Sequence, residues 1–273
     1  MISSLRTGGR RRRSRIIHLS DLHLPADGRG MAACLERTAL EVDALDPDVV
    51  IVSGDLTAFA REAELVAARV VVTELSARRR PVIVVPGNRD RFTPGRFEEH
   101  FADHLRSDLP RHADASGYPF VRLVGDDLAV VGLDSTRVPA YAGMVFGRLG
   151  DDQLARVEAL LADPALAKRT VAITAHHAPL DAEARRNPFT CGLIDGGRLL
   201  EVTAGKCAAL FCGHVHRRYR LAPTAARPEM LCAGSATLAG SEGYWVVEVE
   251  DNRVISAEQF VPDLAEGEDR RVA

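Results

Sequence analysis

The 273-residue chain is 46% hydrophobic and has a formal net charge of −3, the composition of an ordinary globular protein with a sizeable core. Its low net charge and its 5% of aromatic residues offer neither the basic field nor the stacking platforms that nucleic-acid binding needs. Nucleic acids are therefore excluded as the expected partner. Five scattered cysteines without C-x-x-C spacing exclude a disulfide framework and a cysteine-rich zinc site, and they favour a cytoplasmic location.

Both ends of the chain are poor in residues that a core could bury. Residues 1–14 are rich in arginine and are expected to form a disordered tail, with no apolar stretch of signal-peptide length after them. Residues 263–273 are acidic and then basic, and we expect a second flexible tail there. No apolar run approaches the roughly 18 to 20 residues of a membrane span. The economical organisation is one domain over residues 15–262.

Short β-branched runs alternate with longer amphipathic stretches, which is the sequence form of β-α-β units in an α/β or α+β domain. Apolar spacings of three and four predict helices over 31–45, 60–79 and 151–162, the last capped by Asp151 or Asp152. Alternation on both sides of Asp251 and Asn252 predicts a hairpin over 243–260. The other predicted strands span residues 15–19, 49–52, 81–85, 128–133, 170–175, 208–212 and 230–233.

Five of these strands run directly into a polar signature. The signatures are Asp21-Leu-His23, Gly54-Asp55, Gly87-Asn88-Arg89-Asp90, His176-His177 and Gly213-His214-Val215-His216. Because the carboxyl ends of strands collect at one edge of an open α/β sheet, we expect the five signatures to converge in space. An extended backbone would place Asp21 and His23 on one side of their segment, and it would do the same for His214 and His216.

The converging side chains offer carboxylate, imidazole and amide donors but no thiolate. They are Asp21, His23, Asp55, Asn88, His176, His214 and His216. Such a mixture suits manganese, iron or zinc. Seven ligands exceed one tetrahedral shell, but with one bridging carboxylate they make two sites of about four ligands each. The sequence therefore predicts two divalent or trivalent transition metal ions per chain, the clamp that enzymes use for phosphoryl transfer.

At these residues the sequence resembles the calcineurin-like metallophosphoesterase superfamily, in which D-x-H, G-D, G-N-H-[DE], a histidine and G-H-x-H follow in this order. The resemblance implies two mixed β-sheets packed as a sandwich between helices, a four-layer α-β-β-α fold. The sequence alone leaves open which of the adjacent rings of His176 and His177 faces the metal; family position favours His176 as the ligand and places His177 near the substrate. The implied ligands are Asp21, His23 and His216 for one metal, Asn88, His176 and His214 for the other, and Asp55 as the bridge.

The layout looks most like the class III cyclic-nucleotide phosphodiesterase branch. This likeness implies hydrolysis of a phosphodiester, such as a 3′,5′-cyclic nucleotide, by attack of a metal-bound hydroxide, with Asn88 and Arg89 steadying the phosphate. A small, nucleotide-like phosphoester is thus the expected partner, and we allow for a homodimer. The low aromatic content counts against a cyclic nucleotide, since few rings remain to stack on a base.

Arg89 departs from the family motif, which has histidine at this position. In the family that histidine is thought to protonate or polarise the leaving oxygen, a task that needs a pKa near the working pH. Arginine cannot give up a proton there, but it can donate charge-assisted hydrogen bonds to a phosphoryl oxygen. Stable leaving groups are therefore favoured, and a nucleotide pyrophosphatase or a phosphomonoesterase is the alternative. The next residue, Asp90, either orients Arg89 or caps the following turn.

A second alternative is a scaffold that kept the fold without catalysis. Drift of that kind should erode the ligands, whereas here only the non-ligand position at Arg89 differs from the family motif.

Overall fold

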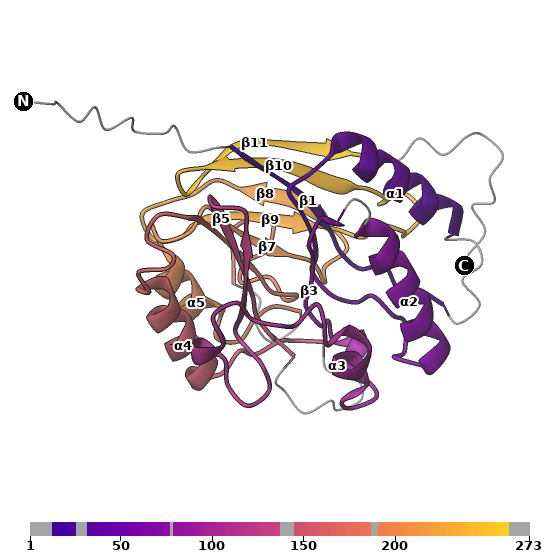
Figure 1. The fold of residues 1–273 in the computed structure, drawn as a ribbon, viewed down its shortest axis with the longest axis horizontal. Helices are drawn as coiled ribbons and strands as arrows, with labels where there is room; N and C mark the ends of the chain where they lie inside the picture. The colour runs from indigo at the N-terminus through magenta and orange to yellow at the C-terminus, as the bar shows by residue number, and fades with distance from the viewer. Residues whose placement is uncertain (1–12, 26–31, 77–78, 137–144, 187–190, 262–273) are drawn as a thin grey trace, which may run out of the picture.

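The computed structural model describes residues 13–25, 32–76, 79–136, 145–186 and 191–261. Two β-sheets pack face to face, and helices cover the outer face of each sheet (Figure 1). The predicted four-layer fold is confirmed. The predicted tail over 263–273 and nearly all of the tail over 1–14 lie outside the described residues. The first tail ends sooner than predicted, because Ser14 already belongs to a strand and Arg13 pairs with Glu248 at 3.0 Å.

The first sheet has five strands in the order β11-β10-β1-β2-β3. Its strands are β1 (Ser14–Leu19), β2 (Val49–Val52), β3 (Val82–Val84), β10 (Tyr244–Glu250) and β11 (Arg253–Phe260). The first three are parallel, and the predicted hairpin β10-β11 joins β1 in antiparallel register. Asp251 and Asn252 form its turn with φ of 51° and 55°, as a tight hairpin turn requires.

The second sheet has six strands in the order β4-β5-β6-β7-β9-β8. Its strands are β4 (Phe120–Val124), β5 (Leu128–Gly132), β6 (Thr170–Thr174), β7 (Ala209–Cys212), β8 (Arg218–Leu221) and β9 (Glu229–Ala233). The four inner strands are parallel, and β4 and β8 are antiparallel edges. The sequence analysis missed these two edge strands.

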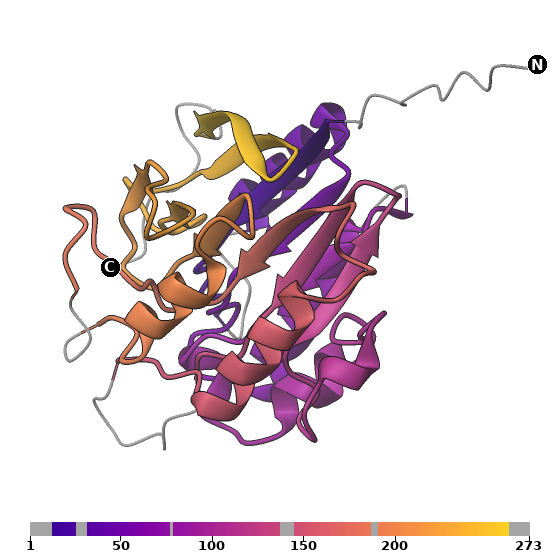
Figure 2. The same ribbon diagram turned by 90° about the vertical axis from the view of Figure 1, so that its left-hand side faces the viewer.

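Helices α1, α2 and α3 lie against the first sheet, and α4 and α5 against the second (Figures 1 and 2). Their bounds are α1 (Ala32–Leu45), α2 (Glu62–Leu75), α3 (Arg96–Phe101), α4 (Asp151–Leu161) and α5 (Gly196–Thr203). The sequence predicted three of them but missed α3 and α5. Among the described residues, no helix has both the length and the apolar character to cross a membrane.

The start of α4 differs from the prediction. Neither Asp151 nor Asp152 caps it, since Gly150 is the N-cap residue and makes no side-chain cap. Instead, the Asp195 carboxylate accepts hydrogen bonds from the backbone N–H groups of Leu149 and Gly150, the latter at 2.8 Å. A carboxylate 45 residues away in the chain thus takes the place of a local cap.

A largely apolar layer fills the space between the two sheets. Ile16, Ile51 and Trp245 from the first sheet meet Val130 and Phe211 from the second, all of them 3% exposed or less. Because strand residues alternate between faces, the intervening positions pack outward against the helices. This close packing brings the carboxyl ends of β1, β2, β3, β6 and β7 to a common edge.

Candidate metal centre

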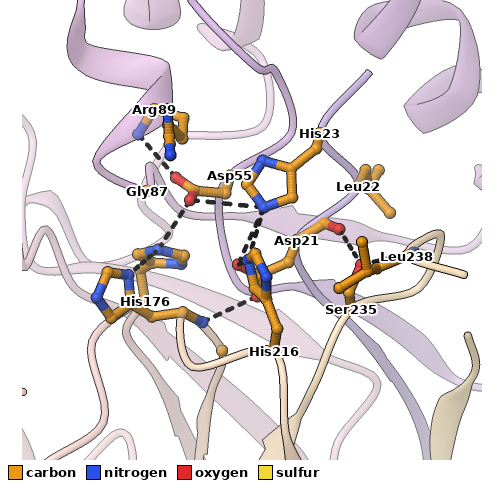
Figure 3. Close-up of polar contacts among 12 residues, drawn as sticks. Asp21, Leu22, His23, Asp55, Gly87, Arg89, His176, His216, Ser235 and Leu238 are labelled. Atoms are coloured by element: carbon orange, nitrogen blue, oxygen red, sulfur yellow. Dashed lines mark hydrogen bonds and ion pairs between the residues drawn. The ribbon is translucent and has the colours of Figure 1, made fainter. Parts of the chain in front are cut away.

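The predicted donors lie together at this common edge, in the loops that follow the strands. Figure 3 shows five of them, which are Asp21, His23, Asp55, His176 and His216. Asp21 and His23 follow β1, Asp55 follows β2 and Asn88 follows β3, all from the first sheet. The second sheet contributes the remaining donors, which are His176 after β6 and His214 and His216 after β7. The predicted convergence is therefore what the fold produces.

One donor group consists of Asp21, His23 and His216, with one ligand atom of each within 4.8 Å of the others. The Nε2 atoms of His23 and His216 are 2.8 Å apart, so both rings present the same nitrogen to one point. Asp21 Oδ1 lies 3.2 Å from Nε2 of His216 and 3.6 Å from Nε2 of His23. Two imidazole nitrogens and a carboxylate oxygen facing one point is the arrangement of a cation site.

The other donor group centres on His176. Its Nε2 lies 3.3 Å from Asn88 Oδ1 and 3.2 Å from His214 Nδ1. Its Nδ1 donates a hydrogen bond of 2.8 Å to the Ser53 carbonyl oxygen, which fixes the proton on that nitrogen and leaves Nε2 free to bind a metal. An outer hydrogen bond of this kind is typical of metal-ligating histidines.

Asp55 lies between the two groups. Its Oδ2 is 3.9 Å from His23 Nε2 on one side and 3.4 Å from His176 Nε2 on the other. Its Oδ1 accepts a hydrogen bond of 2.8 Å from the backbone N–H of Arg89, which orients the carboxylate. This placement is the one that a bridging ligand requires.

The backbone at five of the seven donors is left-handed rather than extended. The φ angles are 54° at Asp21, 43° at His23, 50° at Asp55, 73° at His214 and 51° at His216. The expectation that alternation along an extended segment aligns each pair is therefore wrong. Residues other than glycine rarely adopt this conformation, and such strain clusters at functional sites where the surrounding structure holds it in place. Here β1, β2 and β7 each lead into a sharp turn that directs the donor inward.

Two motif glycines are needed because other donors approach their backbones closely. A Cβ on Gly87 would lie 2.1 Å from Asp55 Oδ1, and one on Gly213 would lie 1.9 Å from Ser20 Oγ and 2.4 Å from Asp21 Oδ2. Any side chain at either position would displace a candidate ligand. The glycines of G-N-R-D and G-H-V-H therefore make room for the carboxylates of D-L-H and G-D.

The charges of the site favour a bound cation. Burial works against a charge on Asp21, but the imidazoles of His216 and His23 outweigh it and hold the pKa of Asp21 well below its usual range. Burial also opposes a charge on His176, yet the Asp55 carboxylate raises the pKa of His176 to about 10. Burial and the neighbouring His176 lower the pKa of His214 to about 4. The buried carboxylates thus attract positive charge, and a cation bound at Nε2 of His176 would take the place of the proton there.

A buried carboxylate oxygen without a hydrogen-bond partner also fits a metal site. Asp21 Oδ1 is buried, and within the described part of the chain it accepts no hydrogen bond of good geometry. Its other oxygen, Oδ2, accepts 2.9 Å from the backbone N–H of His214. Burying a carboxylate oxygen without a hydrogen-bond partner costs free energy, unless a cation binds between it and the two imidazole nitrogens.

His177 lies in the same cluster as the donors. Its ring is fully buried, and its Nδ1 lies 2.8 Å from Ser135 Oγ. Its Nε2 has no partner among the described residues and lies with His176 and His214 in a third donor group. Burial and the charges of these two histidines hold its pKa well below the usual range. His177 is therefore a further donor candidate, and its contact with the substrate stays a prediction.

Asp90 has a role that neither alternative anticipated. Its buried carboxylate accepts hydrogen bonds from the backbone N–H groups of Gly87, Leu56 and Thr57 and from the Thr57 hydroxyl, at 2.9 to 3.2 Å. It therefore ties the loop after β3 to the loop after β2. Of the two predicted phosphate-binding residues, Asn88 lies in the second donor group, and Arg89 directs its guanidinium over the Phe92 ring, with 5.8 Å between the guanidinium carbon and the ring centroid.

Comparisons with known proteins agree with this architecture. The model of the calcineurin-like phosphoesterase family matches residues 14–218. The glycerophosphodiester phosphodiesterase GpdQ of Enterobacter lignolyticus (strain SCF1) is 30% identical over 230 residues, which cover 78% of this chain and 76% of that protein.

Two solved structures share the fold. A dimetal phosphatase from Danio rerio superposes with a TM-score of 0.66 at 15% identity, covering 91% of this chain and 99% of that one. The purple acid phosphatase PPD1 from yellow lupin (Lupinus luteus) seeds gives a TM-score of 0.60 at 13% identity, over 92% of this chain and 54% of the other.

Fold, donor cluster and relatives together define a metal-dependent phosphoester hydrolase. More particularly, the chain belongs to the calcineurin-like phosphoesterase family.

Proposed function

We propose that the protein is a dinuclear metal-dependent phosphodiesterase acting on a small phosphodiester. The observation that carries this proposal is the meeting of two donor groups at one carboxylate, Asp55, whose Oδ2 lies within 3.9 Å of an imidazole nitrogen on each side. Asp21, His23 and His216 would hold one metal, and Asn88, His176 and His214 the other. The diester preference is supported by the 30% identical relative, which is a glycerophosphodiester phosphodiesterase.

When bound, a metal pair supplies positive charge to the phosphate and lowers the pKa of water at the site. The protein's own residues set the geometry. The backbone N–H of Arg89 orients the bridging carboxylate, and the Ser53 carbonyl oxygen orients His176. The Asn88 amide and the Arg89 guanidinium are the groups that we assign to the phosphate oxygens, because both can donate hydrogen bonds to an anion.

A metal-by-substrate panel tests the proposal. Full-length protein freed of metal is reconstituted with Mn²⁺, Fe²⁺ or Zn²⁺, and metal content is measured alongside hydrolysis of bis(p-nitrophenyl) phosphate and 3′,5′-cyclic AMP. We expect about two equivalents of metal and hydrolysis of at least one diester. Binding of less than about one equivalent with no turnover would instead favour the non-catalytic scaffold.

Arg89 favours a second candidate, a nucleotide pyrophosphatase or phosphomonoesterase. Arginine stays charged at working pH and offers no proton to a leaving group, so esters with poor leaving groups should be slow. We predict that Arg89→His raises the kcat for 3′,5′-cyclic AMP by about tenfold more than that for bis(p-nitrophenyl) phosphate, whose leaving group is already a stable anion.

Arg96→His, on α3, is the matched control because it introduces the same imidazole away from the donor cluster. Equal changes on the two esters would refute the leaving-group argument. A nucleoside-diphosphate sugar included in the panel decides between the candidates, since only the pyrophosphatase should prefer it over both diesters.

A further inference from the structure

Two exposed phenylalanine rings lie stacked on each other, each with an arginine over it. Phe59 and Phe92 are each 49% exposed, and their ring centroids are 6.2 Å apart with planes inclined at 22°. The guanidinium carbon of Arg61 is 4.9 Å from the Phe59 centroid, and that of Arg89 is 5.8 Å from the Phe92 centroid. Both distances fall within the range of cation-π attraction, about 6 Å. We call these four residues the aromatic patch.

The aromatic patch is continuous with the candidate metal centre. Phe59 lies four residues after Asp55, in the loop after β2, and Phe92 directly follows the short 3₁₀ turn Arg89–Arg91, in the loop after β3. The backbone N–H of Arg89 bonds to the bridging carboxylate of Asp55 while its guanidinium lies over Phe92. One residue therefore contacts both the proposed bridging ligand and the aromatic patch.

The loop that presents Phe59 is held in a defined shape. The buried Glu64 carboxylate accepts hydrogen bonds from the backbone N–H groups of Phe59 and Arg61, at 2.7 and 3.2 Å. Between these two residues Ala60 has a φ of 51°, a strained value for a residue with a Cβ, and its N–H bonds to Thr57 Oγ1. Strain that buried polar groups hold in place is typical of preorganised binding loops.

We propose that the aromatic patch binds a flat aromatic group of the substrate, a nucleobase or an aryl ring, while the metal centre holds its phosphate. This inference rests on the proposed function. The exposed half of each ring offers apolar surface against which a flat aromatic group can pack, and the two guanidinium groups favour an anionic ligand. A small polyol ester would offer no ring to cover this surface. The low aromatic content of the chain therefore does not argue against a nucleotide, because two of its few rings lie in the loops that carry Asp55 and Arg89.

Binding measurements on the metal-loaded protein test the aromatic patch. Calorimetric titrations compare adenosine 5′-monophosphate with ribose 5-phosphate, and phenyl phosphate with methyl phosphate; the ligands of each pair differ in having or lacking an aromatic group. Wild-type protein should prefer the aromatic ligand of at least one pair, and the pair identifies a base or an aryl ring. Phe59→Leu and Phe92→Leu should each reduce that preference by about tenfold. Leu40→Ala, which removes an exposed leucine on α1, should leave it unchanged.

Tyrosine variants separate the loss of a ring from general damage. Phe59→Tyr and Phe92→Tyr keep the aromatic face and should retain the wild-type preference, and thermal melting checks that every variant folds. A preference that the leucine variants leave within about twofold of wild type would overturn the inference, and so would its absence from wild-type protein. Hydrolysis of bis(p-nitrophenyl) phosphate by the same preparation tests the proposed function separately. Hydrolysis without an aromatic preference would therefore refute the aromatic patch alone.

Discussion

The two sheets bring different chemistry to the candidate metal centre. The first sheet supplies the oxygen donors and one imidazole, and the second sheet supplies imidazoles alone. The first set is Asp21, His23, Asp55 and Asn88, and the second is His176, His214 and His216. Neither sheet holds a complete donor set for either of the proposed metals. The centre is therefore a property of the junction between the sheets, and its geometry depends on how they pack as much as on the donors.

Hydrogen bonds across this junction align the two sets. The Ser53 carbonyl oxygen, at the end of β2, orients the His176 ring from the opposite sheet at 2.8 Å. Ser53 Oγ in turn lies 2.9 Å from Nε2 of His18, a buried residue of β1 whose ring meets Phe211 edge-on. Burial lowers the pKa of His18 to about 3, so it is neutral and structural. Asp21 also crosses the junction by accepting from the His214 N–H.

Removing Asp55, where the two sets meet, should have the largest effect. Asp55→Ala takes a shared oxygen ligand from both groups and leaves two clusters of imidazoles without their central negative charge. We expect loss of both metals and a fall in kcat/KM of at least about a thousandfold, because outer partners of metal ligands alone contribute 10- to 100-fold. Metal analysis and steady-state rates on bis(p-nitrophenyl) phosphate measure this.

His23→Ala is the comparison for Asp55→Ala, because it removes a donor from one group only. That variant should keep about one equivalent of metal, held by the second group. Asp126→Ala, an exposed carboxylate in the β4-β5 turn, controls for the loss of negative charge. If Asp55→Ala retained two equivalents, the bridging assignment would be wrong.

Asp90 tests whether the loops of the first sheet depend on each other. Asp90→Ala leaves the N–H groups of Gly87, Leu56 and Thr57 without their acceptor. Since each buried donor left unsatisfied costs about 1 to 3 kcal/mol, we expect the free energy of unfolding to fall by about 3 kcal/mol. Urea denaturation of the metal-free protein measures this without metal linkage.

Asp90→Asn is the control for shape, because the amide keeps one acceptor oxygen and should lose less than half as much stability. A loss below about 1 kcal/mol in Asp90→Ala would mean that the two loops hold their positions independently.

The donors could be predicted from the sequence, but their geometry could not. Asp21, Asp55, His176 and the others follow strands whose apolar pattern is local, and parallel strands bring their carboxyl ends together. The left-handed φ of Asp21 and His214, by contrast, is imposed by contacts with distant loops, such as the bond from the His214 N–H to Asp21. The alternation of side chains depends only on the segment itself, so it predicted an extended backbone.

The rest of the site escaped prediction for the same reason. Asp90 binds Thr57 across 33 residues, and Phe59 stacks on Phe92 across a similar span, so no local pattern marks either pair. Helix α5 begins with Gly196 and Gly197, which are poor helix formers, and packing of its buried leucines overrides that propensity. Residues defined by contacts between loops are those that a pattern in one segment cannot reveal.

The smallest predicted effect concerns the opposite end of the junction between the sheets. Asn252, in the hairpin turn of the first sheet, accepts a hydrogen bond of 2.7 Å from the N–H of Val171 in β6 of the second sheet. Asn252→Gly keeps a residue suited to the φ of 55° but removes this acceptor, so the unfolding free energy should fall by about 1 kcal/mol. Asn252→Asp retains an acceptor oxygen and should lose less stability.

Because the two sheets remain packed through their apolar layer, metal content and kcat should stay at wild-type values in both variants. A loss of metal in Asn252→Gly would show that this distant hydrogen bond also sets the spacing of the donors. The junction would then behave as one rigid unit.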